Sequence, residues 1–362
     1  MKTYFPNLNP LRFLAAAMVV IFHIELYKKI YDIPNLFHLP FFKIVGKLSV
    51  VLFFVLSGFL ITSLLLKEKE KHQRINFKNF YLRRIFRIWP LYFLILIFGF
   101  FIIPHFPYWS EIPDPAFRPV SDSFWEKLLL YIFILPNLAV SYFGEITGTS
   151  QSWSLGTEEQ FYLFWPFFIA FFRTRLILTM VFLLIFYWTV KLGLGNAVSL
   201  DSRIRIISGF WALFNINCMA IGGIFATLYF DQYTKLLKVL YNKYVFFAVI
   251  FWLLTSLAMG IHYGFFHYEV YSILFGVIIL NLACNPIYSK TLEYPSLNYL
   301  GSISYGIYMY HPVILPLAII TGKYFDSNFV IYAMTFGGTF VISALSYEYF
   351  EKTFLKLKNK FA

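Results

Sequence analysis

Arg12 and His23 are the residues best placed to do chemistry, and they lie eleven positions apart in one apolar stretch. In an α-helix this spacing turns the chain by roughly 1100° and advances it by about 16 Å, so both side chains would lie on one face. If Arg12 marks the edge of a hydrocarbon layer about 30 Å thick, His23 lies near its middle. An ionisable side chain at that depth is costly and marks a functional site by default.

Two roles are open for this pair. A neutral imidazole can accept a proton from a hydroxyl group near neutral pH, so His23 is expected to be a general base. Alternatively, Arg12 extends to the lipid head groups and His23 only makes a hydrogen bond between helices.

A basic segment follows the second apolar stretch. Residues 67–87 form a predicted cytoplasmic loop that carries eight basic residues and two acidic ones. At its end Arg84 and Arg87 stand one helical turn apart, where the next span enters the bilayer. Arginine binds phosphate with two parallel hydrogen bonds, so the two residues would suit a polyphosphate cofactor such as coenzyme A. Attraction to anionic lipids and the positive-inside rule are the alternative explanation.

Residues 151–162 read Q-S-W-S-L-G-T-E-E-Q-F-Y. Ser154 is predicted to cap a helix, with Glu158 in its first turn. Glu158 would then take part in catalysis or bind substrate. The alternative is a capped helix whose aromatic side chains form an interfacial belt. These side chains are Trp153, Phe161 and Tyr162.

Residues 300–313, L-G-S-I-S-Y-G-I-Y-M-Y-H-P-V, combine small residues with a second deep histidine. Small side chains let membrane helices approach closely. The small residues are Gly301, Ser302, Ser304 and Gly306. His311 would bind substrate or would simply be packed between helices.

The composition is that of a membrane protein. Of the 362 residues 59% are hydrophobic and only 13% charged, against about 25% charged in soluble domains. Apolar stretches recur from end to end, which predicts one all-α membrane domain over residues 1–362. We expect about 10 transmembrane helices, a re-entrant segment at 128–143 and both termini in the cytoplasm, with a basic tail at 351–362.

Other classes are disfavoured. The net charge of +12 is carried mostly by short loops, which argues against nucleic acid as a partner. Cys218 and Cys284 cannot form a zinc cluster alone, so no metal site is expected.

These patterns, in this order, resemble the acyltransferase-3 family of bacterial integral-membrane O-acyltransferases. The resemblance covers about residues 5–355, and Thr353 stands where the family commonly has proline. The matching residues are Arg12 and His23, the stretch 53–62, Arg84 and Arg87, the W-S-L-x-x-E residues Trp153, Ser154, Leu155 and Glu158, and the S-Y-x-I-Y-x-x-H residues Ser304, Tyr305, Ile307, Tyr308 and His311.

The resemblance implies transfer of an acyl group, usually acetyl, from cytoplasmic acyl-CoA to a hydroxyl group of a carbohydrate. Acceptors in the family include O-antigen, exopolysaccharide, peptidoglycan and macrolide-type molecules. The enzyme would lie in the bacterial cytoplasmic (inner) membrane among its lipids, with acyl-CoA as donor substrate and no permanently bound cofactor. Some members carry a fused extracytoplasmic hydrolase-like domain. We expect a stand-alone domain here, so either this domain or a separate extracytoplasmic partner would complete the transfer.

Roles for individual residues follow from both arguments. His23, Glu158 and Arg12 are expected to be catalytic, and Arg84 and Arg87 to bind acyl-CoA. His23 would deprotonate the acceptor or pass the acyl group through an enzyme-bound intermediate. The expected substrate-binding residues are Trp153, Ser154, Tyr162 and His311. The alternative function is a transporter or flippase of a lipid-linked glycan, although the sequence shows no internal repeat.

Overall fold

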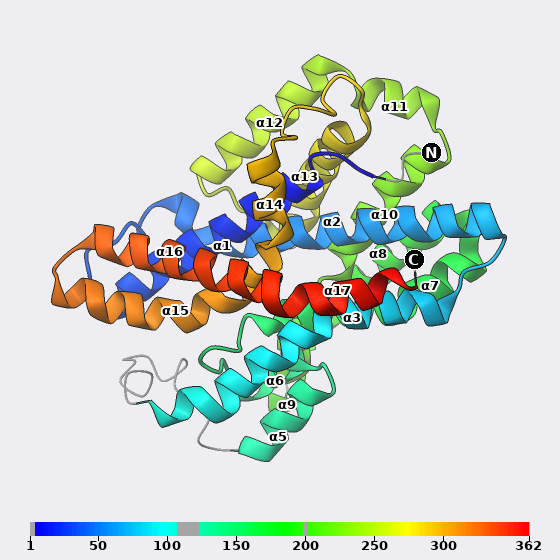
Figure 1. The fold of residues 1–362 in the computed structure, drawn as a ribbon. Coiled ribbons are helices and arrows are strands. Elements are labelled where there is room, and N and C mark those ends of the chain that lie inside the picture. The colour runs from blue at the N-terminus through cyan, green and yellow to red at the C-terminus, as the bar shows by residue number, and fades with distance from the viewer. Residues whose placement is uncertain (1–3, 107–122, 198–200, 362) are drawn as a thin grey trace. The chain divides into compact units, whose positions relative to one another are not determined.

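The computed structural model describes residues 4–106, 123–197 and 201–361, and most of them lie in helices. No strand occurs in this part of the chain, so the all-α prediction is confirmed. The helices (Figure 1) are α1 (Leu8–Ile30), α2 (Pro40–His72), α3 (Phe77–Ile97), α5 (Phe124–Ile132), α6 (Pro136–Phe143), α7 (Ser152–Phe172), α8 (Leu176–Ala197), α9 (Ser202–Leu213), α10 (Ile216–Phe230), α11 (Thr234–Leu240), α12 (Lys243–Ala258), α13 (His267–Cys284), α14 (Pro295–Ser302), α15 (Ser304–Tyr324), α16 (Asn328–Ser346) and α17 (Lys352–Asn359).

The chain divides into two compact units, each built from three separate segments. Unit 1 comprises Met1–Ala15, Leu39–Ile75 and Glu158–Ser302, and unit 2 comprises Ala16–His38, Asn76–Thr157 and Ile303–Ala362. Helices α1 and α7 each contribute residues to both units. The assignment of residues 1–362 to one membrane domain stays a prediction.

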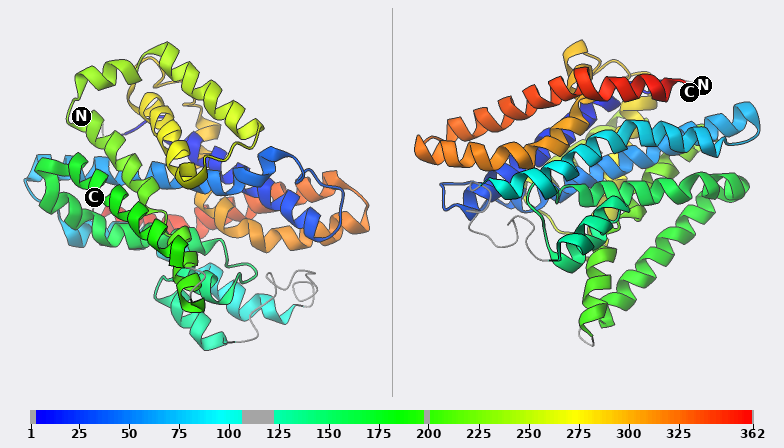
Figure 2. Two further views of the ribbon diagram at one scale, coloured as in Figure 1. Left: turned by 180° about the vertical axis from the view of Figure 1, so that it is seen from behind. Right: turned by 60° about the horizontal axis from the view of Figure 1, so that its bottom comes forward.

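Long apolar helices dominate both units. Among the described residues, 8 helical stretches are long and apolar enough to cross a membrane, or up to 9 if α11 and α12, bent by 58°, form one span. One of the eight, Ser152–Ala197, contains both α7 and α8, and the chain reverses at the turn Arg173–Arg175 between them (Figure 2). The chain is thus built of several potential spans, whereas the ten passes and the cytoplasmic termini stay predictions.

The expected re-entrant segment is two short helices. Helices α5 and α6 have 9 and 8 residues. A helix that crosses a bilayer needs about 20 residues, so neither can do so alone.

The segment predicted as a basic loop, residues 67–87, is mostly helical. Helix α2 continues to His72 and α3 begins at Phe77, so only residues 73–76 lie outside a helix. Lysine and glutamate alternate at 67–71, and both are good helix formers that can pair one turn apart. The tail is likewise helical over Lys352–Asn359, and the cytoplasmic location of both segments stays a prediction.

In unit 1, glycines let α2 and α10 approach closely. A Cβ on Gly58 would lie 1.9 Å from the carbonyl oxygen of Met219, and one on Gly222 would lie 2.2 Å from that of Val55. Only a residue without a side chain fits at such backbone contacts.

In unit 2, α15 and α16 run antiparallel side by side (Figure 1, orange). A Cβ on Gly306 of α15 would lie 3.0 Å from that of Ser343. In unit 1, one on Gly301 would lie 2.2 Å from the carbonyl oxygen of Asn9. The small residues of 300–313 therefore permit close packing, as expected.

The α2–α10 contact is testable by adding one methyl group. Gly58→Ala places a carbon inside the backbone of α10, so the two helices must separate. We expect the purified protein's thermal unfolding midpoint to fall, with a cost of about 1–3 kcal/mol. Gly337→Ala in α16 is the control, because a Cβ there meets nothing within 4 Å. Alanine favours a helix over glycine by about 1 kcal/mol, so this variant should keep or raise the midpoint. Equal midpoints for the two variants would contradict the packing argument.

Candidate active site

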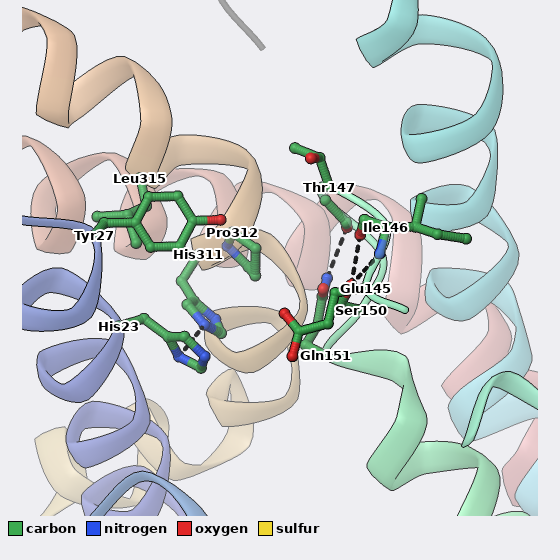
Figure 3. A pocket seen from close by; sticks show the side chains of 11 residues that line it. His23, Tyr27, Glu145, Ile146, Thr147, Ser150, Gln151, His311, Pro312 and Leu315 are labelled. Carbon is green, nitrogen blue, oxygen red and sulfur yellow. Dashed lines mark hydrogen bonds between the residues drawn. The ribbon is translucent and has the colours of Figure 1, made fainter. Parts of the chain in front are cut away.

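Two histidines from distant parts of the sequence meet inside unit 2. The Nε2 atom of His311, on α15, lies 3.1 Å from the Nδ1 atom of His23, on α1 (Figure 3). His311 is fully buried, and His23 is half-buried. The structure thus brings together the two deep histidines that the sequence placed in separate motifs.

The neighbouring carbonyl groups determine which nitrogens carry hydrogen. His23 Nδ1 lies 3.0 Å from the Val19 carbonyl oxygen, and His311 Nδ1 lies 3.3 Å from that of Ile307. A carbonyl oxygen only accepts, so both Nδ1 atoms must be donors. His311 Nε2 then accepts a share of the His23 Nδ1 hydrogen, and His23 Nε2 keeps a lone pair. A hydrogen bond between two ring nitrogens requires that one of them has a lone pair. The two histidines therefore cannot both be protonated while this bond exists.

Pro312 explains how α15 accommodates the ring of His311. Proline has no N–H, so Pro312 cannot donate to the carbonyl of Tyr308, four residues earlier. The ring of His311 lies against this carbonyl and that of Ile307. The H-P pair thus places a hydrogen-bonding ring beside a carbonyl to which the proline cannot donate.

The histidine pair lines a small cavity (Figure 3). Its volume is ≈ 30 Å³, and a water molecule needs about 10–15 Å³ by this measure, so it has room for two or three hydroxyl-sized groups. The other wall is the loop from Glu145 to Gln151, and Glu145, which is exposed, extends from it toward the rings. The complete lining is His23, Tyr27, Glu145, Ile146, Thr147, Gly148, Ser150, Gln151, His311, Pro312 and Leu315.

Gln151 and Ser154 join this loop to α15. The Gln151 side-chain amide donates to the Met309 carbonyl at 2.8 Å, and the Tyr308 hydroxyl donates to the Gln151 carbonyl at 2.9 Å. The Ser154 hydroxyl lies 2.8 Å from that of Tyr308. The W-S-L motif and the S-Y-x-I-Y-x-x-H motif are therefore in contact.

Two expectations for this region change. Ser154 is not a helix cap, because α7 begins at Ser152 and the Ser154 hydroxyl bonds within the first turn and to α15. Trp153 is half-buried, and neither it nor Ser154 is among the described residues that line the cavity. Their substrate-binding roles stay predictions.

Sequence reasoning missed the loop Glu145–Gln151. Its residues have no apolar periodicity and fall in no span, so nothing marked them. Gln151 was the detectable one, because it is the first residue of the quoted Q-S-W-S-L pattern.

Glu158 lies in unit 1 and holds two hydroxyl groups. Both Ser57, on α2, and Tyr162, one turn later on α7, donate to its Oε1 atom. Tyr162 is buried, and its hydroxyl is committed to this carboxylate. The catalytic role of Glu158 and the substrate-binding role of Tyr162 stay predictions.

Arg12 lies near the start of α1. Its Nη1 atom donates to the side-chain oxygen of Asn9 at 3.4 Å, and the residue is half-buried. Arg12 and His23 share one helix, as the spacing predicted.

Arg84 and Arg87 lie three residues apart in the first half of α3. Both are half-buried, and Arg87 interacts electrostatically with Glu351. The turn that places Glu351 is a π-helical segment, Tyr347–Glu351, between α16 and α17. Such segments occur often at functional sites.

Comparison with known proteins connects these features. The acyltransferase domain family (Acyl_transf_3) matches residues 5–348 of the chain. The chain is 26% identical to the peptidoglycan O-acetyltransferase OatA of Listeria monocytogenes over 97% of its own length and 56% of that protein's. It is also 26% identical to the O-acetyltransferase OatA of Staphylococcus aureus, over 96% of this chain and 57% of the relative.

The chain therefore spans somewhat more than half the length of these relatives. No solved structure matches it.

The two hydroxyl groups on Glu158 are expected to stabilise unit 1. Tyr162→Phe removes one of them, and a hydrogen bond to a charged group contributes about 1.5–3 kcal/mol. The thermal unfolding midpoint of the purified protein should therefore fall. Tyr324→Phe, at a residue that is 83% exposed, is the control and should leave the midpoint unchanged. Equal midpoints would show that the Tyr162 hydroxyl does not support the carboxylate.

Proposed function

The chain belongs to the acyltransferase-3 family, and on that premise we propose that it is a membrane O-acetyltransferase that moves an acetyl group from acetyl-CoA to a hydroxyl group of a cell-envelope carbohydrate. The observation that carries the proposal is the His23 Nε2 lone pair beside a cavity of hydroxyl size. The names of the two relatives support acetyl as the group and peptidoglycan as one acceptor.

The reaction can be written with His23 as the only general base. The acceptor hydroxyl gives its proton to His23 Nε2, and its oxygen forms a bond to the acetyl carbon. The carbon–sulfur bond breaks, and coenzyme A leaves as a thiolate that takes the proton back from His23. The products are an acetyl ester and free coenzyme A.

His311 fits this reaction as a positioning residue. Its Nε2 atom accepts from His23 Nδ1, which fixes the His23 ring and leaves the other nitrogen for the acceptor. When His23 is protonated, the same contact and the Val19 carbonyl stabilise the positive charge. His311 thereby changes from the expected substrate-binding residue to the partner of the base.

The donor is assigned to α3. Two arginines one turn apart can each form paired hydrogen bonds with phosphate, and coenzyme A carries several phosphate groups. Tyr305, six residues before His311, donates to the Ile88 carbonyl at 3.0 Å, next to Arg87. The helix that carries His311 is thus bonded to the helix that carries the arginine pair, which supports a donor that extends from one to the other.

The remaining assignments are part of the same proposal. The donor arrives from the cytoplasm, and the protein is a multi-pass protein of the bacterial cytoplasmic membrane. Arg12 binds the donor or sets the local electrostatic potential, and Glu158 orients the acceptor. A separate extracytoplasmic partner or this domain itself completes delivery to the acceptor.

The first test removes the two histidines singly and together. His23→Ala should lower acetyl transfer from labelled acetyl-CoA by about 100-fold or more, the usual contribution of a general base. His311→Ala should also lower it, and the double variant should be no worse than His23→Ala because the two rings act as one unit. Each variant must be present in membranes at the wild-type level. Normal transfer by His23→Ala would overturn the proposal, and a wild-type protein that neither binds nor consumes acetyl-CoA would indicate a transporter.

The second test concerns the donor arginines. Arg84→Ala combined with Arg87→Ala should weaken acetyl-CoA binding about 10-fold or more, because two charged hydrogen-bond donors are lost. Arg203→Ala combined with Arg205→Ala removes the same charge from exposed positions of α9 and is the control. If both double variants bind acetyl-CoA equally well, Arg84 and Arg87 serve only to orient the protein in the membrane.

A further inference from the structure

Two residues that line the cavity each carry a buried polar atom that has no hydrogen-bond partner in the described part of the chain. These atoms are the Thr147 hydroxyl oxygen and the Gln151 side-chain oxygen. Thr147 is 1% exposed and Gln151 6% exposed. A buried polar atom without a partner costs about 1–3 kcal/mol. Several other described residues also carry such an atom, and these two differ from them because their residues line the cavity of the histidine pair.

The chemistry of the two atoms restricts what can complete them. The two hydrogens of the Gln151 amide are donated to the Gly148 and Met309 carbonyls. Its oxygen can therefore only accept, and it needs a ligand with a hydrogen on oxygen or nitrogen. The Thr147 hydroxyl can donate or accept.

We propose that Thr147 and Gln151 bind a second polar group of the acceptor, next to the hydroxyl that His23 deprotonates. The ligand class is a carbohydrate with a hydroxyl or amide N–H beside the acylated position. This inference rests on the proposed function and assigns the loop Glu145–Gln151 to acceptor selection.

The acetyl thioester itself has no hydrogen on oxygen or nitrogen, so it offers nothing to the Gln151 oxygen. The nearest donor on coenzyme A is an amide N–H two carbons from the sulfur, and the affinity for acetyl-CoA measured below distinguishes that source from the acceptor. The cavity holds two or three hydroxyl-sized groups. A sugar presents two such groups on neighbouring carbons, which matches one for His23 and one for the loop.

The test uses the purified full-length protein, labelled acetyl-CoA and a set of monodeoxy methyl glycosides. The acylated position is first read from the product of the parent glycoside by NMR. With the wild-type protein, removal of one glycoside hydroxyl other than the acylated one should slow transfer about tenfold or more. The Thr147 and Gln151 oxygens would then lack the group that they bind. With Thr147→Val or Gln151→Leu this difference should shrink to below about threefold.

Thr149→Val is the matched control, because it makes the same change in the same loop. The Thr149 hydroxyl already donates to the Ile146 carbonyl, so its loss should affect stability and leave acceptor preference unchanged. Thr147→Val removes a hydroxyl without a protein partner, so the thermal unfolding midpoint of this variant should equal or exceed that of the wild type. Its discrimination between acceptor glycosides should be lost. Gln151→Leu also loses two backbone contacts, which makes Thr147→Val the decisive variant.

The outcomes are distinct. The inference is overturned if Thr147→Val discriminates between the parent and the monodeoxy glycosides as the wild-type protein does. If that variant also binds acetyl-CoA more weakly, Thr147 and Gln151 are assigned to the donor. If the wild-type protein transfers acetyl to none of the acceptors, this result contradicts the proposed function itself.

Discussion

The hydrogen bond between His23 and His311 is the constraint on which the site depends. In a membrane interior each polar group must be satisfied within the protein, because no water is available there. Each ring meets this demand with its Nδ1 atom near a carbonyl one turn earlier on its own helix. The remaining contact joins residues 288 positions apart and requires α1 and α15 to stay together. Of the four ring nitrogens, only Nε2 of His23 then has no structural role, and it is the one available for chemistry.

The same demand for partners organises the surroundings. Glu158 binds two hydroxyl groups, and in unit 1 the buried Glu269 accepts from Trp188 at 2.8 Å and from Asn217 at 2.7 Å. Some buried atoms of the described residues have no partner, such as Glu269 Oε2, and those of Thr147 and Gln151 differ because their residues line the same cavity as the histidine pair. At Thr147 stability alone would favour an apolar side chain, so its polarity is explained better by a bound ligand than by folding. Gln151 differs, because its amide also donates to two backbone carbonyls.

Sequence reasoning was strong where one physical signal dominates. Hydropathy identified the helices, and the cost of an ionisable group in lipid identified His23. It was weaker for His311, because no sequence pattern shows that two helices far apart in the chain will meet. Ser154 resembled a helix cap in sequence, whereas the structure uses its hydroxyl between α7 and α15. Apart from Gln151, the loop Glu145–Gln151 could not be predicted, since its placement depends on contacts between Gln151 and α15.

The C-terminal region extends this argument to the donor side. Tyr310, next to His311 on α15, donates to the Ser346 hydroxyl at 3.0 Å, and Ser346 donates to Glu351 at 3.1 Å. Glu351 in turn interacts with Arg87 on α3. The π-helical turn at Tyr347–Glu351 shifts the helical register just where this carboxylate must face inward. Hydrogen bonds thus run from the residue beside the proposed base partner through Ser346 to Glu351, and the charge of Glu351 acts on the proposed phosphate ligand. In the proposed reaction the thioester must be held at a set distance from His23. The hydrogen bonds that join α15 to α16 and the π-helical turn, together with the Tyr305–Ile88 bond between α15 and α3, supply that rigidity.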